Sequence, residues 1–98
     1  MNRQEFEDSM LLLKKQVEML TRALGMRAEF YEVIHPHDLP QGSRYGYGIR
    51  LEYNNYNTTD ILNNTMNFNA EDINRMAVLL VSSFFRDSIK ALSEKVNK

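Results

Sequence analysis

The sequence predicts an α+β domain in which two long helices flank a small antiparallel sheet. Apolar residues recur at helical spacing near both ends of the 98-residue chain, whereas the middle alternates with the period of two that is typical of strands. A chain of this length normally forms one domain, because single cores are built from roughly 50 to 200 residues. We therefore expect residues 1–98 to form a single domain with an N-terminal helix, an antiparallel meander of three strands and a C-terminal helix. Two or four strands are the alternatives.

The first helix is predicted over about residues 2–25. Asn2, with Glu5 three positions later, matches a capping box, and Gly25 stands where a helix commonly ends. Between these ends, one apolar stripe follows spacings of three and four residues. Its members are Phe6, Met10, Leu13, Val17, Leu20 and Leu24.

The second helix is predicted over about residues 70–95. Asn69 is placed to cap it, and Glu71 and Asp72 would face the positive end of the helix dipole. A broad apolar face follows, which predicts burial along most of the helix. It consists of Ile73, Met76, Ala77, Leu80, Val81, Phe84, Ser88 and Leu92.

Strands are predicted over about residues 27–34, 44–53 and 56–62. The second has the clearest alternation, with one face toward the core. That face carries Tyr45, Tyr47, Ile49, Leu51 and Tyr53. Asn54 and Asn55 then suit a two-residue hairpin turn, because asparagine tolerates positive φ.

The apolar stripe of the first helix has two interpretations. It either packs on the sheet of its own chain or contacts a second copy of the chain. A helix of about 24 residues is roughly 36 Å long, which exceeds the expected diameter of so small a domain. We therefore expect a homo-oligomer, with a dimer favoured and the whole stripe from Phe6 to Leu24 as its self-association surface.

Composition narrows the classes of function. Twelve basic and thirteen acidic side chains give a net charge of −1, so no global basic field favours nucleic acids or anionic membranes. The absence of cysteine excludes disulfides, thiol nucleophiles and cysteine-based metal sites. The sequence shows neither a signal-peptide core nor an apolar stretch long enough to span a membrane, which predicts a cytoplasmic location.

Residues 42–50 are the most unusual stretch, because glycines alternate with arginines and tyrosines. Arg44, Tyr47 and Arg50 are candidate ligand- or partner-binding residues: guanidinium groups pair with phosphates, and an aromatic ring can stack on a base. A nucleotide or a single-stranded nucleic acid is a possible ligand. However, the glycines lie within a predicted strand and do not open a helix, which excludes a phosphate-binding loop. Glycines opposite a core face more often mark a bend or the close approach of a neighbour than a cofactor site, so we favour this structural interpretation. A protein interface on the glycine face is a further alternative.

His35 and His37 are a second pair of candidate binding residues, with Asp38 beside them. Two imidazoles and a carboxylate have metal-ligand character. The chain contains no third histidine, and Pro36 indicates a solvated loop, so we predict neither a metal site nor a cofactor.

No convergent nucleophile and base can be assembled from these residues, so we expect a protein without enzymatic activity. A metal-dependent hydrolase built on His35, His37 and Asp38 is the last-ranked alternative. The predicted function is that of a small binding or inhibitory module that acts through protein–protein contacts. The size, the abundance of asparagine and the well-capped helices are compatible with the small accessory proteins of bacteria and their phages. The alternative prediction is a sponge or sensor for a nucleotide or another anionic small ligand.

Overall fold

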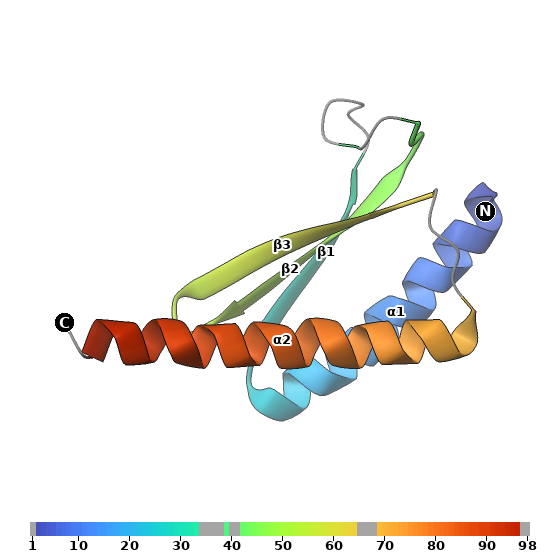
Figure 1. Cartoon of the computed structure of the whole chain (residues 1–98). Helices are drawn as coiled ribbons and strands as arrows, with labels where there is room; N and C mark the ends of the chain where they lie inside the picture. Colours follow the sequence, from blue (N-terminus) through green and yellow to red (C-terminus); the bar gives the residue numbers. More distant parts are fainter. Residues whose placement is uncertain (1, 34–38, 40–41, 65–68, 97–98) are drawn as a thin grey trace.

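The computed structural model describes residues 2–33, 39, 42–64 and 69–96 and confirms the α+β prediction (Figure 1). All three predicted strands are present, and both helices are long. The elements in chain order are α1 (Arg3–Leu24), β1 (Arg27–Val33), β2 (Gly46–Tyr53), β3 (Tyr56–Asn63) and α2 (Ala70–Val96).

The sheet is an antiparallel meander in the order β1-β2-β3. Asn54 and Asn55 join β2 to β3 with φ angles of 52° and 65°. Positive φ at both central residues is the geometry that matches the twist of a two-residue hairpin, so this predicted turn is confirmed. The register places Tyr53 opposite Tyr56 beside the turn.

Both helices begin with asparagine caps, as the sequence predicts. Asn2 Oδ1 accepts a hydrogen bond from the Glu5 amide at 2.8 Å, and Asn69 Oδ1 accepts one from the Asp72 amide at 2.9 Å. Gly25 ends α1 with a φ of 71°, a conformation that glycine adopts without strain. These local signals fix the helix ends to within one residue of the predicted bounds.

One face of the sheet carries the core, and both helices pack on that face. Ile49 and Leu51 of β2 are fully buried at its centre, while the alternate β2 residues lie on the opposite, outer face. Four ring pairs extend the core outward: Phe6 with Tyr45, Phe30 with Tyr47, Tyr53 with Phe85, and Tyr56 with Phe84.

The second helix extends beyond the core at its C-terminal end. Its 27 residues span roughly 40 Å and run past the β2–β3 turn (Figure 1). Ser88 is its last buried residue, and Leu92, which the sequence places on the apolar face, is 43% exposed. The sequence predicts such an overhang for the first helix, but it occurs in α2. In the described part of the chain, no helix is long and apolar enough to cross a membrane.

The two glycines of β2 are explained by side chains that lie on them. A Cβ atom at Gly48 would overlap the ring of Tyr31, its cross-strand neighbour on β1, and one at Gly46 would overlap Leu39. Side chains of the same chain therefore cover both glycines, which confirms the predicted close approach of neighbouring side chains.

We expect Gly48→Ala to change the sign of its effect when Tyr31 is removed. In the native chain the new methyl group displaces the Tyr31 ring, whose contact with β2 is lost. In a Tyr31→Ala background the same substitution should stabilise the strand by about 0.5 to 1 kcal/mol, because glycine has the larger conformational entropy to lose. A double-mutant cycle by urea unfolding measures the coupling. Equal effects of Gly48→Ala in both backgrounds would contradict the contact between Gly48 and the Tyr31 ring.

Candidate functional site

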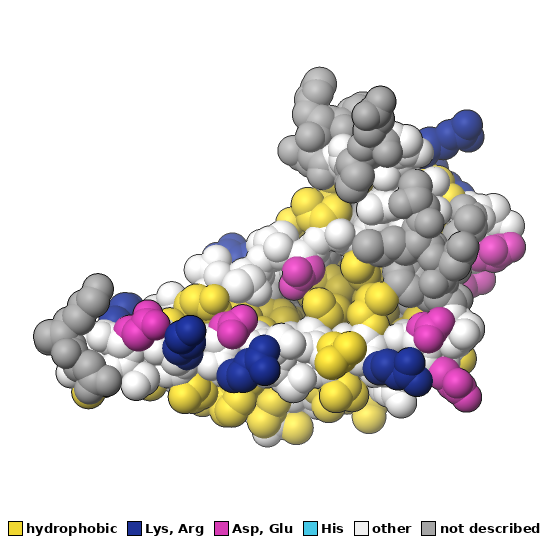
Figure 2. Space-filling model, in the orientation of Figure 1, with side chains coloured by type: hydrophobic (Ala, Val, Ile, Leu, Met, Phe, Trp, Pro, Cys, Tyr) yellow, Lys and Arg dark blue, Asp and Glu magenta, His cyan; other side chains and the backbone are white. Residues whose placement is uncertain are grey.

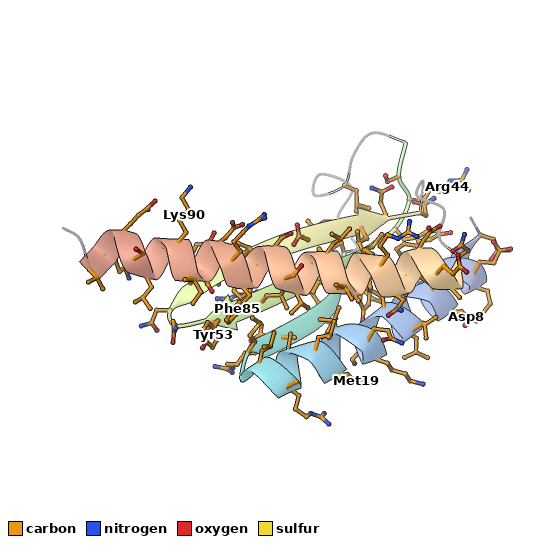
Figure 3. All side chains as sticks on the ribbon, turned by 60° about the horizontal axis from the view of Figure 1, so that its bottom comes forward. Asp8, Met19, Arg44, Tyr53, Phe85 and Lys90 are labelled. Atoms are coloured by element: carbon orange, nitrogen blue, oxygen red, sulfur yellow. The ribbon has the colours of Figure 1, made fainter. Side chains whose placement is uncertain are left out.

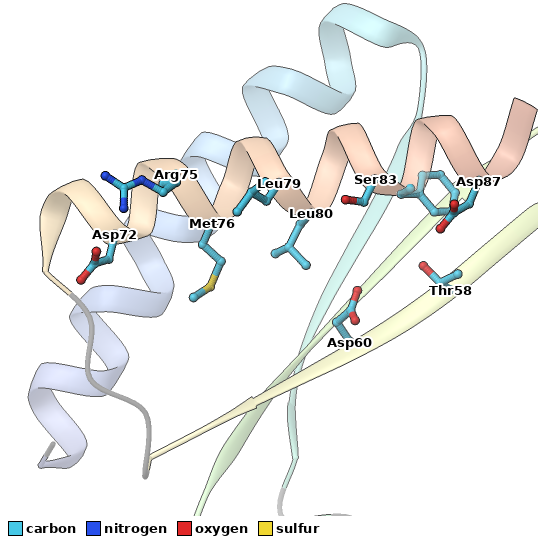
Figure 4. Close-up of a pocket in the computed structure, with 10 residues that line it drawn as sticks. Thr58, Asp60, Asp72, Arg75, Met76, Leu79, Leu80, Ser83 and Asp87 are labelled. Carbon is cyan, nitrogen blue, oxygen red and sulfur yellow. The ribbon is translucent and has the colours of Figure 1, made fainter.

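An open groove lies between α2 and the free edge of β3 (Figure 4). Its volume is about 610 Å³. Two side chains of β3 form one wall, and one flank of α2 forms the other. The lining residues are Thr58 and Asp60 from β3, and Asp72, Arg75, Met76, Leu79, Leu80, Ser83, Phe84 and Asp87 from α2.

The groove results from the short polar residues on the core side of β3. Thr58 lies opposite Leu51, and Asp60 lies opposite Ile49, so both occupy positions whose neighbours on β2 are fully buried apolar residues. Because β3 is an edge strand and these two side chains are small, the core ends at this point. The flank of α2 beyond the core stripe is therefore left uncovered.

The floor of the groove is apolar. Phe84 is buried against Tyr56, Met76 and Leu80 are partly buried, and Leu79 is 57% exposed. Figure 2 shows hydrophobic atoms on the surface between β3 and α2. An exposed leucine next to a hollow is an apolar surface that a partner can cover.

Three carboxylates surround this floor. Asp87 points from α2 toward β3, Asp60 points from β3 toward α2, and Arg75 points away from the strand (Figure 4). Asp72, in the first turn of α2, accepts a hydrogen bond from the Asn69 amide through Oδ2 at 3.5 Å. None of the three aspartates forms an ion pair with another described residue. Figure 4 shows them spread along the groove. No three His, Cys, Asp or Glu side chains of the described segments are grouped so as to hold a metal ion. The groove thus combines an apolar floor with negative charge.

The backbone of β3 supplies a further binding element. Over the described residues β3 pairs only with β2, so the N–H and C=O groups on its other edge between Tyr56 and Leu62 have no strand partner. This edge borders the groove, because Thr58 and Asp60 belong to the same strand. Unpaired strand edges are sites where an additional strand can pair.

The predicted candidates Arg44, Tyr47 and Arg50 do not come together in one site. Arg50 lies on the outer face of β2, with Glu52 Oε2 at 3.8 Å and Glu29 Oε2 at 4.0 Å from its guanidinium nitrogens. Arg44 precedes β2, and its amide donates to Asn64 Oδ1 at 2.8 Å. It lies at the opposite end of the strand from Tyr53 (Figure 3).

The third of these candidates, Tyr47, faces the helices. It lines a second hollow, of about 420 Å³, between the first turns of α1 and the β1–β2 pair. Burial raises the pKa of Tyr47, and the nearby carboxylates of Glu18 and Glu32 raise this pKa further. Carboxylates therefore surround both Tyr47 and Arg50, which disfavours an anionic ligand at either residue.

We expect stability to fall at high pH partly through Tyr47. In the folded chain its pKa lies above the ordinary value of 10.0, so the unfolded phenol loses its proton first. The contribution of Tyr47 to the unfolding free energy is complete below the pKa of the unfolded phenol and is lost as the pH rises through the pKa of the folded one. Between about pH 9 and 11, urea unfolding should show a smaller loss of unfolding free energy for Tyr47→Phe than for the native chain. Equal losses in the two proteins would mean that another group causes the pH dependence.

The other predicted binding residues, His35 and His37, lie outside the described residues, as does Asp38.

The stripe predicted for self-association lies mainly inside the chain's own core. Phe6, Met10, Leu13 and Val17 are buried among residues of the sheet and α2, and Leu20 packs partly against them. Leu24 is 42% exposed. A second copy of the folded chain therefore cannot contact the four buried residues. The exposed large apolar residues of α1 that it can reach are Leu24 of the stripe and, outside the stripe, Leu11, Leu12 and Met19.

Comparison with known proteins places this arrangement in no group. The chain matches no protein-family model, no curated protein and no solved structure. The geometry of the groove, its charge and the open strand edge beside it therefore identify it as the candidate site.

Proposed function

We propose that this protein is a small, non-enzymatic binding module that acts through protein–protein contacts at the groove between α2 and β3. The observation that supports this proposal most directly is the exposed Leu79, which lies beside an open strand edge. Backbone groups of such an edge provide affinity, and an adjacent apolar groove provides selectivity, when a protein binds an extended segment. Both elements lie in one place on this chain.

The polar groups of the groove support binding better than catalysis. Catalysis requires a nucleophile or acid–base pair whose atoms converge on one point. Here Asp60, Asp72 and Asp87 are spread along the groove, and among the described residues neither a histidine nor a cysteine lines it. An inhibitory role, homodimer formation and a cytoplasmic location remain predictions of the sequence.

The alternative function, a sponge or sensor for an anionic small ligand, also remains a prediction. A native-state ligand raises stability by RT ln(1 + [L]/Kd), so a nucleotide panel in a thermal-shift assay tests it directly. The carboxylates around Arg50 and Tyr47 lead us to expect no stabilisation.

The proposed function is tested by two neighbouring substitutions on α2. Leu79→Gln removes the exposed apolar side chain of the groove, while Val78→Gln makes the same kind of change at a residue that does not line it. Both side chains are exposed, so both variants should fold. Each tagged protein is incubated with an extract of the source cells, and the retained proteins are quantified by mass spectrometry.

We expect partners that the native chain and Val78→Gln retain and that Leu79→Gln loses. Circular dichroism and thermal unfolding of all three proteins confirm that the fold is unchanged. If every retained protein binds Leu79→Gln as well as the native chain, the groove is not the binding surface and the proposal fails.

A further inference from the structure

We propose that the partner segment is an extended, lysine- or arginine-bearing stretch of another protein that pairs with β3 as a fourth strand. This inference rests on the proposed function and specifies the chemistry of its partner. It follows from the open edge of β3, the position of the apolar floor and the sign of the charges around it.

The backbone of β3 can accept a further strand along its open edge. A strand that pairs with β3 continues the sheet, and every second side chain of it points to the face on which α2 lies. Thr58 and Asp60 already occupy that face of β3 and line the groove. The alternate side chains of the added strand would therefore lie beside them and over Leu79 and Leu80, so an extended segment fits the groove.

The groove carries uncompensated negative charge. Asp60 and Asp87 form no ion pair among the described residues, and Arg75 is directed away from β3. Asp72 Oδ2, in contrast, accepts a hydrogen bond from the Asn69 amide at 3.5 Å. A lysine or arginine has an apolar stem and a charged end. Its stem would cover the apolar floor while its charge reaches Asp60 or Asp87. Apolar residues alone would fill the floor but leave these two carboxylates uncompensated.

A second copy of the chain is disfavoured as the occupant. Within the described segments, the edge strands available for pairing are β3 and β1. A second β3 would bring another Asp60 to the groove, and β1 would bring Glu32, which lies opposite Tyr47 on the core side. Both arrangements add like charge to a groove that is already negative, which disfavours pairing.

The experiment uses a defined probe. A fluorescent peptide, Thr-Lys-Thr-Leu-Thr-Lys-Thr-Leu-Thr, places lysine and leucine on one side of an extended strand and threonine on the other. Two matched peptides replace lysine by glutamate or carry N-methyl groups on alternate backbone nitrogens. Fluorescence anisotropy measures the affinity of each peptide for the full chain, and amide hydrogen exchange locates the bound peptide.

We expect the lysine peptide to bind and to slow amide exchange in β3, and both matched peptides to bind at least about tenfold more weakly. The double variant Asp60→Asn with Asp87→Asn should weaken the lysine peptide about threefold or more, because each exposed ion pair contributes modestly. Asp8→Asn with Glu94→Gln removes the same charge outside the groove and should leave the affinity unchanged.

Other results overturn the inference in distinguishable ways. Equal affinity for the lysine and glutamate peptides excludes a basic partner, and binding that survives N-methylation excludes strand pairing. A dimer seen by native mass spectrometry and lost in Leu79→Gln assigns the groove to a second copy. If no peptide binds, this inference fails, and the comparison of Leu79→Gln with Val78→Gln decides separately whether the groove binds proteins at all.

Discussion

Leu13→Ala should destabilise the chain by about 2 to 5 kcal/mol, the range found when a buried leucine is truncated. Leu13 is 0% exposed and belongs to the core cluster that joins α1 to the sheet and α2. Truncation removes its contacts and leaves a cavity at the centre of a small core, which can close only in part. The loss is a large fraction of the 5 to 15 kcal/mol that is typical of a whole domain, so the unfolding midpoint in urea should fall clearly.

Leu12→Ala is the matched control, because Leu12 is the adjacent residue on α1 and lies at the surface. We expect it to change the unfolding free energy by less than about 1 kcal/mol. Measurement at several protein concentrations separates the two interpretations of the helix stripe. If Leu13 belongs to the core of a single chain, the loss of unfolding free energy in Leu13→Ala is independent of protein concentration. A dimer contact at Leu13 would make the apparent stability depend on protein concentration.

The helices could be predicted closely because their determinants are local. Asn2 and Asn69 each bond to an amide three residues away, and Gly25 adopts positive φ within its own turn. Such contacts are visible in a short window of sequence. The turn at Asn54 and Asn55 belongs to the same category.

The start of β2 could not be predicted as well, because a distant residue determines it. The sequence pattern extends the strand to Arg44, whereas the structure begins it at Gly46. Asn64 accepts hydrogen bonds from the amides of Arg44 and Tyr45, at 2.8 and 3.3 Å, through its side chain. This contact spans about twenty residues and has no signature in the local alternation.

The groove escaped prediction for the same physical reason. In the sequence, the place of Asp72 in the first turn of a helix is enough to explain it, and Leu79 lies off the main apolar stripe. Only the packing of α2 across the sheet brings these residues next to Asp60 on an edge strand. The position of β3 at an edge was implicit in the meander order, and its two small polar residues on the core side were the available signal.

Phe84→Ala should cost about 3 to 5 kcal/mol, as expected for a buried phenylalanine. Phe84 is 3% exposed, and its ring centroid lies 5.5 Å from that of Tyr56 on β3. Because β3 is the edge strand and α2 has few other contacts with it, this ring pair is a major link between the two walls of the groove. Urea unfolding of the variant measures the cost.

Phe85→Ala tests whether the effect belongs to this position or to any aromatic residue of α2. Phe85 is only partly buried, and it contacts Tyr53 on β2 with centroids 5.6 Å apart (Figure 3). Its truncation should lower the unfolding free energy clearly less than that of Phe84, because the partly buried Phe85 ring contributes less buried apolar area to the fold. Double-mutant cycles that combine Tyr56→Ala with each phenylalanine variant should give a coupling of about 0.5 to 1.5 kcal/mol for Phe84→Ala and almost none for Phe85→Ala. Equal coupling to both residues would mean that α2 does not present Phe84 to β3, and the groove would lose the wall on which its proposed function depends.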